Sequence, residues 1–301
     1  MRSSIDHYLK ERVTLIEAEL ARIVAESDSP AARLFDAMRY SLLAGGKRLR
    51  PILALASCEA VGGRIEAAMG FACAIEMIHT YSMIHDDLPC MDNDDLRRGR
   101  PTSHKVYGEA IATLAGDALL TDAFEVAARS AAQLNPAQVN PTIVLQTLRE
   151  VAEAAGSAGM VAGQVIDVLG EGKPAGLGQL KYLHSRKTGA LFVAAVRSGA
   201  RLGGANQPQL ESLTDYARAL GLAFQVVDDL LDVESSTEQM GKRTHKDQAR
   251  GKATYPAILG VERSRELARQ LERQALEALA AFDQRAEPLR DLANFAVERN
   301  A

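Results

Sequence analysis

The stretch MGFACAIEMIHTYSMIHDDLPCMD (residues 69–92) is an apolar segment that ends in three aspartates. As far as residue 84 it is nearly apolar on all sides at helical spacing, and such helices lie at the centre of a bundle. A second stretch, LGLAFQVVDDLLD (residues 220–232), combines an apolar helix and three aspartates in the same way. Because an isolated carboxylate is costly in an apolar interior, these aspartates are expected to be accompanied by cations.

Apolar residues recur at helical spacing along almost the whole chain, so an all-α fold is expected. The spacing predicts helices at residues 5–26, 31–43, 51–61, 65–88, 105–132, 140–168, 176–200, 207–234, 252–283 and 287–299. No linker rich in serine or glycine divides the chain, and no repeat of solenoid period is present. We therefore expect residues 1–301 to form one all-α domain.

Composition limits the classes of partner and the compartment. The chain of 301 residues has 35 Lys and Arg against 39 Asp and Glu, so a nucleic-acid partner is not expected. Three cysteines form no CxxC pair, which favours a reducing compartment. The first residues lack the apolar stretch of a signal peptide, and no uninterrupted apolar run reaches about 18 residues. We expect a soluble cytoplasmic protein without a membrane anchor.

The spacing of the aspartates predicts their geometry. Asp228 and Asp232 share a helix face, whereas Asp86 and Asp92 are about 240° apart on a regular helix. Pro89 removes a helical hydrogen bond between them, so we predict a distorted helix end around residues 88–91 that brings Asp92 towards Asp86. Either cluster alone is also compatible with a solvated helix end. Together they predict two acidic walls that face one cavity, bridged by Mg²⁺ and a phosphorylated substrate.

Basic residues accompany both acidic clusters. They lie in GGKRLRP (residues 45–51), at Arg97 and Arg98, in KTG (residues 187–189), and at Lys242 and Lys252. Each alone is typical of a solvated surface, but their joint placement indicates phosphate binding, because guanidinium groups and helix starts suit phosphate oxygens.

Isolated polar residues on the apolar helices are further candidates for the site. His79 precedes Asp86 by nearly two turns and can hydrogen-bond an anion. Gln164, Asp167 and Gln225 are candidates for a polar site wall, whereas Asp117 is interpreted as structural.

The motifs, in order, resemble those of the trans-isoprenyl diphosphate synthases, most closely the bacterial farnesyl diphosphate synthases. The matching motifs are GGKRLRP, IHDDLPCMDNDDLRRGRPTSH, GMVAGQVIDV, KTGALF, LAFQVVDDLLDV, GKRTHKD and GKATYP, and the similarity runs from about residue 35 to residue 301. It implies an isoprenoid-synthase-type bundle of about ten core helices around a central cavity, a homodimer, and three Mg²⁺ ions in the active site.

The resemblance also implies roles for individual residues. The metal-binding set is Asp86, Asp87, Asp92, Asp167, Asp228 and Asp232, in which Asp87 positions the first wall, Asp232 acts through water and Asp167 is an outer ligand. The allylic diphosphate would be held by Arg97, Lys187, Thr188, Gln225, Lys242 and Lys252. Isopentenyl diphosphate would be held by Lys47, Arg50, His79 and Arg98. The groups expected to act in catalysis are Asp86, Asp92, Lys187, Thr188, Gln225 and Asp228.

The implied reaction is a head-to-tail condensation that needs no Ser, Cys or His nucleophile. Ionisation of dimethylallyl or geranyl diphosphate gives pyrophosphate and an allylic cation, which the double bond of isopentenyl diphosphate attacks. Tyr81 and Ser82 lie about one turn before Asp86. An aromatic residue there, together with the two-residue insertion in the first motif, resembles the pattern of family members that make fifteen-carbon products. We therefore expect (E,E)-farnesyl diphosphate, with geranylgeranyl diphosphate as the alternative product.

Two other functions compete with this interpretation. A terpene cyclase also ionises an allylic diphosphate, but its cavity is usually rich in aromatic residues, and this chain has no Trp. A cyclase also would not need the second diphosphate site. A catalytically silent partner subunit would be expected to have lost an acidic cluster, and neither is lost. The end Arg299-Asn300-Ala301 lacks the final basic residue common in related enzymes.

Overall fold

The protein is a bundle of helices in a computed structural model that describes residues 2–134, 139–173, 176–234 and 253–298. The first half contains α1 (Arg2–Ile23), α2 (Ala32–Leu42), α3 (Leu49–Ala60), α4 (Ile65–Asp86), α5 (Ser103–Tyr107), α6 (Glu109–Ala132) and α7 (Pro141–Ala155). The second half contains α8 (Met160–Gly170), α9 (Leu177–His184), α10 (Ala190–Leu202), α11 (Gln207–Glu234), α14 (Tyr255–Leu259), α15 (Val261–Ala278) and α16 (Glu287–Glu298). This architecture confirms the expected all-α class.

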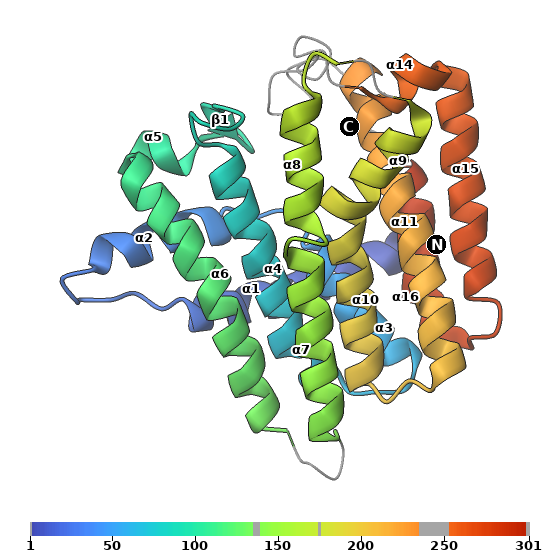
Figure 1. The fold of residues 1–301 in the computed structure, drawn as a ribbon. Coiled ribbons are helices and arrows are strands. Elements are labelled where there is room, and N and C mark those ends of the chain that lie inside the picture. Colours follow the sequence, from blue (N-terminus) through green and yellow to red (C-terminus); the bar gives the residue numbers. More distant parts are fainter. Residues whose placement is uncertain (1, 135–138, 174–175, 235–252, 299–301) are drawn as a thin grey trace.

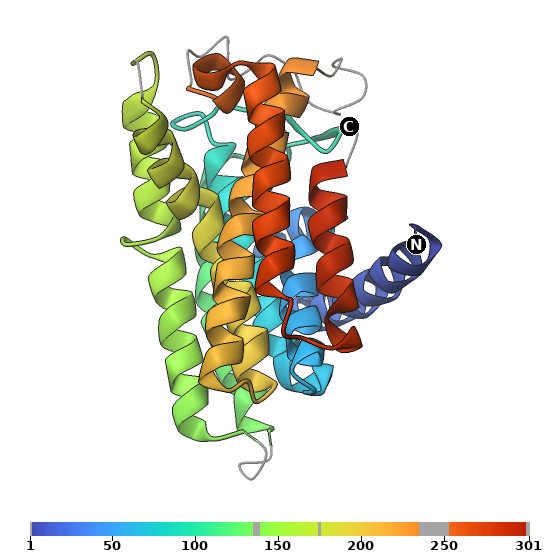
Figure 2. The ribbon, with the colours of Figure 1, turned by 90° about the vertical axis from the view of Figure 1, so that its right-hand side faces the viewer.

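α4 forms the centre of the bundle, where it packs against α3, α6 and α10 (Figure 1). The long helices run roughly side by side, whereas α1 lies obliquely across them (Figure 2). Within the described residues, α4 alone is long and apolar enough to cross a membrane by length and composition, although charged residues interrupt its apolar run. Since 72% of that apolar window is buried inside the protein, α4 has the burial of a core helix.

The central helices approach one another closely because small residues stand at their contacts. A Cβ atom at Gly199 of α10 would overlap the carbonyl group of Ala54 on α3. The same apolar cluster extends from Ile5 on α1 to Ala296 on α16, so helices from both ends of the chain share it. This packing fixes the end of α4, whereas a second apolar cluster that includes Val226 and Leu230 packs the end of α11. The two aspartate clusters lie at these helix ends.

Four predicted helices are interrupted in the structure. The segment 105–132 divides at Gly108, and the segment 252–283 divides at Gly260; both glycines have a positive φ that other residues rarely adopt. The segment 140–168 breaks at residues 156–159, between α7 and α8. The segment 176–200 contains a π-helical turn at Ser185–Gly189, which joins α9 to α10.

A small hairpin that the sequence analysis did not predict follows the first aspartate cluster. β1 (Leu96–Arg97) pairs antiparallel with β2 (Arg100–Pro101), so that Arg97 lies opposite Arg100. The connecting residues Arg98 and Gly99 both have positive φ, at 53° and 73°. A two-residue turn of that conformation matches the twist of the strands. Such turns usually carry Asn-Gly or Asp-Gly, and because Arg98 stands in the first position here, the sequence does not reveal the hairpin.

Candidate active site

The first acidic wall is built where α4 ends. The helix stops at Asp86, and residues 87–92 form a succession of turns. The amide of Asp92 donates a hydrogen bond to the carbonyl of Asp86 at 2.8 Å, so the chain folds back on the helix end. The distortion expected around residues 88–91 is thus present, but as a turn after the helix rather than as a bulge within it.

Arg97 of the hairpin forms an ion pair with the carboxylate of Asp87. Its Nε lies 3.0 and 2.9 Å from the two carboxylate oxygens, its Nη2 lies 2.7 Å from Oδ1, and Asp87 is only 3% exposed. A charge-assisted pair of this kind fixes the hairpin to the end of α4. The ion pair supports the positioning role expected for Asp87 but not direct metal binding, because Arg97 already occupies its oxygens.

Lys187 joins the acidic groups of different helices. Its Nζ lies 2.6 Å from Oδ2 of Asp167 on α8 and 3.8 Å from Oδ2 of Asp86 on α4. Burial raises the pKa of Asp86, and the ammonium group of Lys187 only partly opposes this effect. The lysine comes from the π-helical turn, a distortion that is frequent at functional sites.

A chain of polar contacts runs beside Lys187. The hydroxyl of Thr188 donates to Oε1 of Gln225 at 3.1 Å, and the amide nitrogen of Gln225 donates to Asp229 at 3.0 Å. The other oxygen of Asp229 accepts the backbone amide of Tyr255, also at 3.0 Å. Asp229 therefore holds the side chain of Gln225 in place, a positioning role that the sequence analysis did not assign.

Two adjoining cavities meet at Lys187, with volumes of about 630 and 490 Å³. Asp86, Thr188 and Asp228 line the larger one, together with apolar residues of α8. Asp92 and Gln225 line the smaller one. The structure thus brings the two predicted acidic walls together at one connected site.

The larger cavity also contains two of the groups expected to bind isopentenyl diphosphate. Arg50 and His79 both line it, and the Arg50 guanidinium lies over the ring of Phe192, 5.0 Å from its centroid. Burial lowers the pKa of Arg50 to about 10. Burial and the nearby charge of Arg50 lower the pKa of His79 well below its usual range, so His79 is neutral at pH 7.

Three other predicted site residues line neither of the two cavities. Lys47 is exposed and lines neither cavity, while Arg98 donates to the carbonyl of Gly45 and lines a separate small pocket beside the hairpin. Asp232 is 8% exposed and also lines neither cavity.

Two predicted diphosphate-binding lysines cannot be placed, and the aspartate interpreted as structural lies on a neighbouring helix. Lys242 and Lys252, expected to hold the allylic diphosphate, lie outside the described residues. Asp117, interpreted as structural, lies on α6 with a carboxylate oxygen 3.8 Å from Nε2 of His85.

The donor chemistry of the site fits a hard divalent cation. Within the described ranges no three acidic, His or Cys residues form a preassembled metal cluster. Mg²⁺ commonly takes one or two carboxylates together with phosphate oxygens and water, so it does not need such a cluster. Asp86 and Asp228 line the same cavity, and burial raises the pKa of Asp86, so further positive charge would stabilise its carboxylate. A cation bound with a diphosphate would supply that charge.

Tyr81 and Ser82 both line the larger cavity, one helical turn before Asp86. The Tyr81 ring is 7% exposed and packs edge-on against His85 with 5.6 Å between ring centroids. The hydroxyl of Ser82 donates to the carbonyl of His79 at 2.8 Å, so it faces back along α4. The position of Tyr81 suits a barrier to a growing chain.

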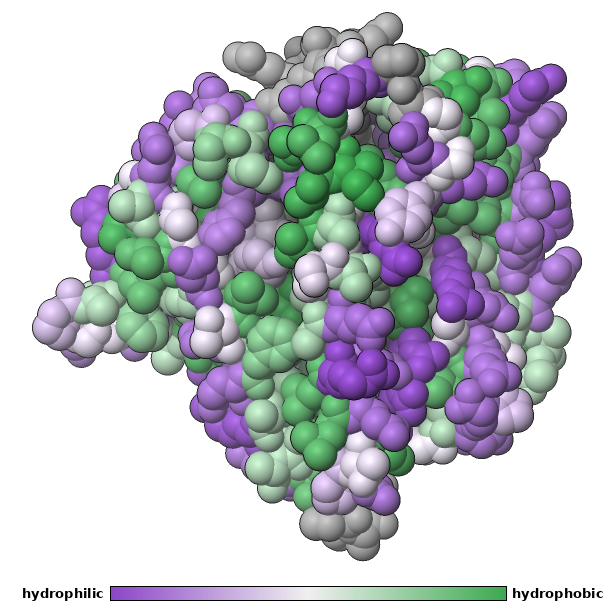
Figure 3. Space-filling model, in the orientation of Figure 1, coloured by the Kyte–Doolittle hydropathy of each residue, from purple (hydrophilic) through white to green (hydrophobic). Residues whose placement is uncertain are grey.

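The sequence analysis missed the apolar wall opposite α4. Val161, Val165, Val168 and Leu169 of α8 line the larger cavity and remain 42–63% exposed. Figure 3 shows the corresponding apolar area over α8. The segment GMVAGQVIDV carries the signal, since its apolar residues recur at helical spacing on one face. These side chains suit a hydrocarbon tail.

Comparisons with known proteins agree with this geometry. Residues 31–289 match the family described as Polyprenyl synthetase. The chain is 49% identical over 292 residues to the large subunit 1 of a chloroplastic heterodimeric geranylgeranyl pyrophosphate synthase of Arabidopsis thaliana, which covers 95% of this chain and 78% of the relative. It is 51% identical over 270 residues to a chloroplastic geranylgeranyl pyrophosphate synthase of Catharanthus roseus, covering 89% of this chain and 74% of the relative.

Solved structures show the same likeness. An FPP/GFPP synthase of Zymomonas mobilis superposes with a TM-score of 0.88 at 39% identity, covering 99% of this chain and 100% of that chain. A geranylgeranyl pyrophosphate synthetase of Pyrococcus horikoshii superposes with a TM-score of 0.89 at 31% identity and covers 99% of both chains. The fold is therefore that of the prenyl-transferring synthases, and the chain belongs to the polyprenyl synthetase family.

Proposed function

We propose that this protein condenses isopentenyl diphosphate with an allylic diphosphate, and that the reaction requires Mg²⁺. The observation that carries the proposal is the position of Lys187, which approaches Asp86 and Asp167 from a turn that also presents Thr188 to the cavity. Acidic groups, a cation and apolar walls therefore surround one space. That combination suits a substrate with a diphosphate head and a hydrocarbon tail.

The first chemical step breaks the bond between the allylic carbon and the diphosphate oxygen. The electron pair leaves with pyrophosphate, and Lys187 and Arg97 stabilise the negative charge that grows there. Bound Mg²⁺, held by Asp86, Asp92 and Asp228, would supply further positive charge.

The second step joins the two substrates. The Thr188 hydroxyl and the Gln225 amide place uncharged dipoles beside the allylic cation, where a stronger nucleophile would trap it. Arg50 and neutral His79 hold isopentenyl diphosphate so that the electron pair of its double bond forms the new carbon–carbon bond. A proton then passes from the condensed chain to pyrophosphate, and a new double bond remains.

The product that we propose is geranylgeranyl diphosphate. Its support comes from relatives named geranylgeranyl pyrophosphate synthase, which are 50–52% identical to this chain over 264–271 residues in plants. The farnesyl diphosphate product expected from the sequence becomes the second candidate.

One specific observation favours the second candidate. The Tyr81 ring lies in the cavity wall and is held by His85, so it is placed to stop chain growth early. The Zymomonas mobilis structure named FPP/GFPP synthase, which is 39% identical to this chain, also supports it.

Product analysis tests both candidates. The protein is incubated with Mg²⁺, labelled isopentenyl diphosphate and either geranyl or farnesyl diphosphate, and the dephosphorylated products are separated by chain length. Geranylgeraniol from both acceptors supports the proposed product. Farnesol from geranyl diphosphate, without elongation of farnesyl diphosphate, replaces it with the second candidate. A cyclic hydrocarbon from farnesyl diphosphate alone would instead indicate a cyclase.

Assembly and location remain proposals as well. We propose a homodimer, although one relative is named as the large subunit of a heterodimer. Exposed Leu114 on α6 and Leu145 on α7 support a subunit interface on those helices. Light scattering of the purified protein distinguishes a dimer from a monomer. We also propose a cytoplasmic location, which microscopy of a tagged chain tests.

A further inference from the structure

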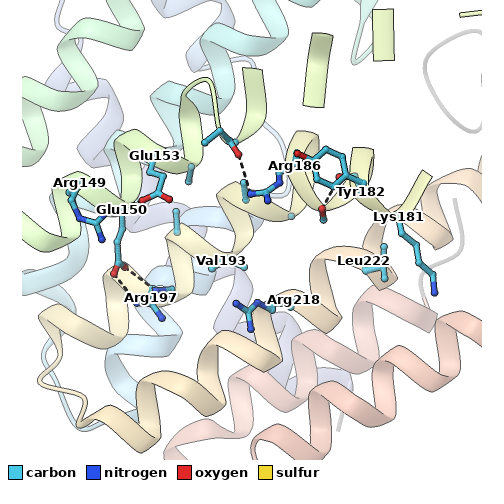
Figure 4. A pocket seen from close by; sticks show the side chains of 17 residues that line it. Arg149, Glu150, Glu153, Lys181, Tyr182, Arg186, Val193, Arg197, Arg218 and Leu222 are labelled. Atoms are coloured by element: carbon cyan, nitrogen blue, oxygen red, sulfur yellow. Dashed lines mark hydrogen bonds and ion pairs between the residues drawn. The ribbon is translucent and has the colours of Figure 1, made fainter. Parts of the chain in front are cut away.

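A third large cavity, of about 720 Å³, lies outside the catalytic site (Figure 4). It is bounded by α7, α9, the π-helical turn, α10 and α11, and none of its lining residues lines either catalytic cavity. Its volume is within the range of small-molecule sites. Nothing in the proposed reaction uses this cavity.

Positive charge dominates the lining. Five cationic side chains face two carboxylates, and both carboxylates are already paired. Arg197 and Arg201 share Glu150, with nitrogen–oxygen distances of 2.7 Å, and Arg149 pairs with Glu153 at 2.9 Å. An excess of uncompensated cations in a concave site attracts anions.

Two of the cations lack an acidic partner. Within the described part of the chain, no carboxylate forms an ion pair with Lys181 or Arg186. Arg186 instead donates to the carbonyl of Ala158 at 3.1 Å and packs over the ring of Tyr182. Its buried Nε has no hydrogen-bond partner among the residues that the structure describes. A guanidinium with spare donors binds phosphate oxygens well.

The cavity floor is apolar. It includes Ala154, Ala190, Val193, Ala194 and Leu222. Figure 4 shows Val193 and Leu222 between the cationic groups, with Arg149 and Arg197 towards one end and Lys181 at the other. This arrangement suits an anion that carries an apolar body, more than inorganic phosphate.

The cavity and the catalytic site share one wall, the π-helical turn. Ser185, Arg186 and Gly189 face the third cavity, whereas Lys187 and Thr188 line the catalytic one. The turn is tightly held, because a Cβ atom at Gly163 of α8 would overlap the backbone of Lys187, and one at Gly221 of α11 would lie 3.3 Å from Gly189. Because Arg186 and Lys187 are consecutive in this turn, a backbone shift on the side of Arg186 would displace Lys187 as well.

We propose that this cavity binds an organic phosphate with an apolar body, and that its occupancy slows catalysis. The phosphate competes with the Ala158 carbonyl for the guanidinium of Arg186. As Arg186 turns to the phosphate, the π-helical turn shifts and Lys187 moves away from Asp86 and Asp167. The inference goes beyond the proposed reaction, since binding at this site does not depend on which reaction the catalytic site performs.

Calorimetry with n-octyl phosphate in EDTA tests the binding directly and needs no turnover. The variant Lys181→Glu/Arg218→Glu reverses two charges in the cavity, and the control Arg263→Glu/Arg269→Glu reverses two exposed charges on α15. We expect the cavity variant to raise the Kd about tenfold or more, and the control to match the unchanged protein. No binding to the unchanged protein, or equal binding to both variants, would overturn the site.

Kinetics at saturating concentrations of both substrates test the effect on catalysis. We expect octyl phosphate to lower kcat in the unchanged protein and in the control, but not in the cavity variant, whose activity without octyl phosphate stays normal. Inhibition that excess substrate relieves would place the compound in the catalytic cavity and overturn the regulatory role. An unchanged kcat despite calorimetric binding would overturn that role as well.

The same calorimetry with geranyl diphosphate distinguishes two sources of the ligand. A second binding event that disappears in the cavity variant would assign the site to the isoprenoid diphosphates that this family handles. Binding of octyl phosphate alone would assign it to other organic phosphates of similar polarity.

Discussion

Lys187 is a cation placed between acidic groups of α4 and α8. Its ammonium group lies within 4 Å of Asp86 and Asp167 and lines both catalytic cavities. Lys187→Gln removes the charge but keeps most of the length, so we expect kcat to fall by about 10²–10³, as when one transition-state donor is lost. Steady-state kinetics measure this. The control Lys181→Gln removes a lysine six residues earlier and should leave kcat unchanged; an equal kcat in both variants would contradict the role.

Tyr81 is the residue expected to control product length. The change Tyr81→Ala removes the ring that closes the cavity beside His85, so the variant should release longer products than the unchanged protein. Tyr81→Phe keeps the ring and should keep the product. Chromatography of the dephosphorylated products checks both. An identical product distribution in Tyr81→Ala would exclude the floor role.

The sequence located most residues of the site but not what each one contacts. Residue type and spacing indicated Asp86, Lys187 and Gln225, because polar groups on apolar helices require a partner. The family resemblance placed Asp87 in the metal-binding set as the residue that positions the first wall, but it did not predict the ion pair with Arg97. A contact between Asp87 and a hairpin ten residues later depends on the tertiary fold, which spacing along one helix does not report.

The contact between α8 and the π-helical turn depends on Gly163. A side chain there would push α8 away from the backbone of Lys187. We expect Gly163→Ala to lower the free energy of unfolding by about 1–3 kcal/mol, the typical cost of overpacking, and to lower kcat as well. Urea denaturation measures the stability. Gly170→Ala in the same helix meets open space, so comparable destabilisation there would show that the effect is not specific to this contact.

A partly buried carboxylate, Glu150, links α7 to α10 and makes the stability of the fold depend on pH. Burial raises the pKa of Glu150, but its bonds to Arg197 and Arg201 outweigh that effect and leave the pKa lowered. The stabilisation is therefore complete above the ordinary glutamate pKa of about 4.3 and is lost as the pH falls through the lowered folded value. Glu150→Gln should lower Tm at pH 7, and its difference from the unchanged protein should shrink as the pH falls below about 4.3.

Thermal unfolding at several pH values measures that dependence. Glu153→Gln is the control, because Glu153 forms an exposed pair with Arg149 that contributes little. A Tm difference for Glu150→Gln that stays constant down to pH 3 would contradict the ion-pair account.

Helix periodicity predicted where the helices lie but not where they break. α11 spans residues 207–234 as predicted, because its apolar pattern is continuous and no break interrupts it. The breaks at Gly108 and Gly260 require positive φ, yet a glycine inside an apolar pattern does not by itself reveal its conformation. The π-helical turn has no distinct sequence signal, since it follows from packing between Gly163 and Gly221.

For the molecule as a whole, two aspartate clusters on apolar helices were sufficient to predict one cavity between acidic walls. The cavity forms because α4 and α11 lie centrally in the same bundle and end near the same face (Figure 1). The third cavity could not be predicted, because its lining comes from five elements whose residues are ordinary surface charges and small apolar side chains in the sequence. Only their assembly makes it concave.

The most direct test of the account measures the condensation itself. Purified protein is mixed with isopentenyl and geranyl diphosphates, and pyrophosphate release and carbon-chain growth are followed with Mg²⁺ and with EDTA. The account predicts that both signals appear together, that EDTA abolishes both, and that Asp228→Asn reduces both strongly. Pyrophosphate release and chain growth that continue in EDTA, or the absence of chain growth with Mg²⁺ present, would contradict it.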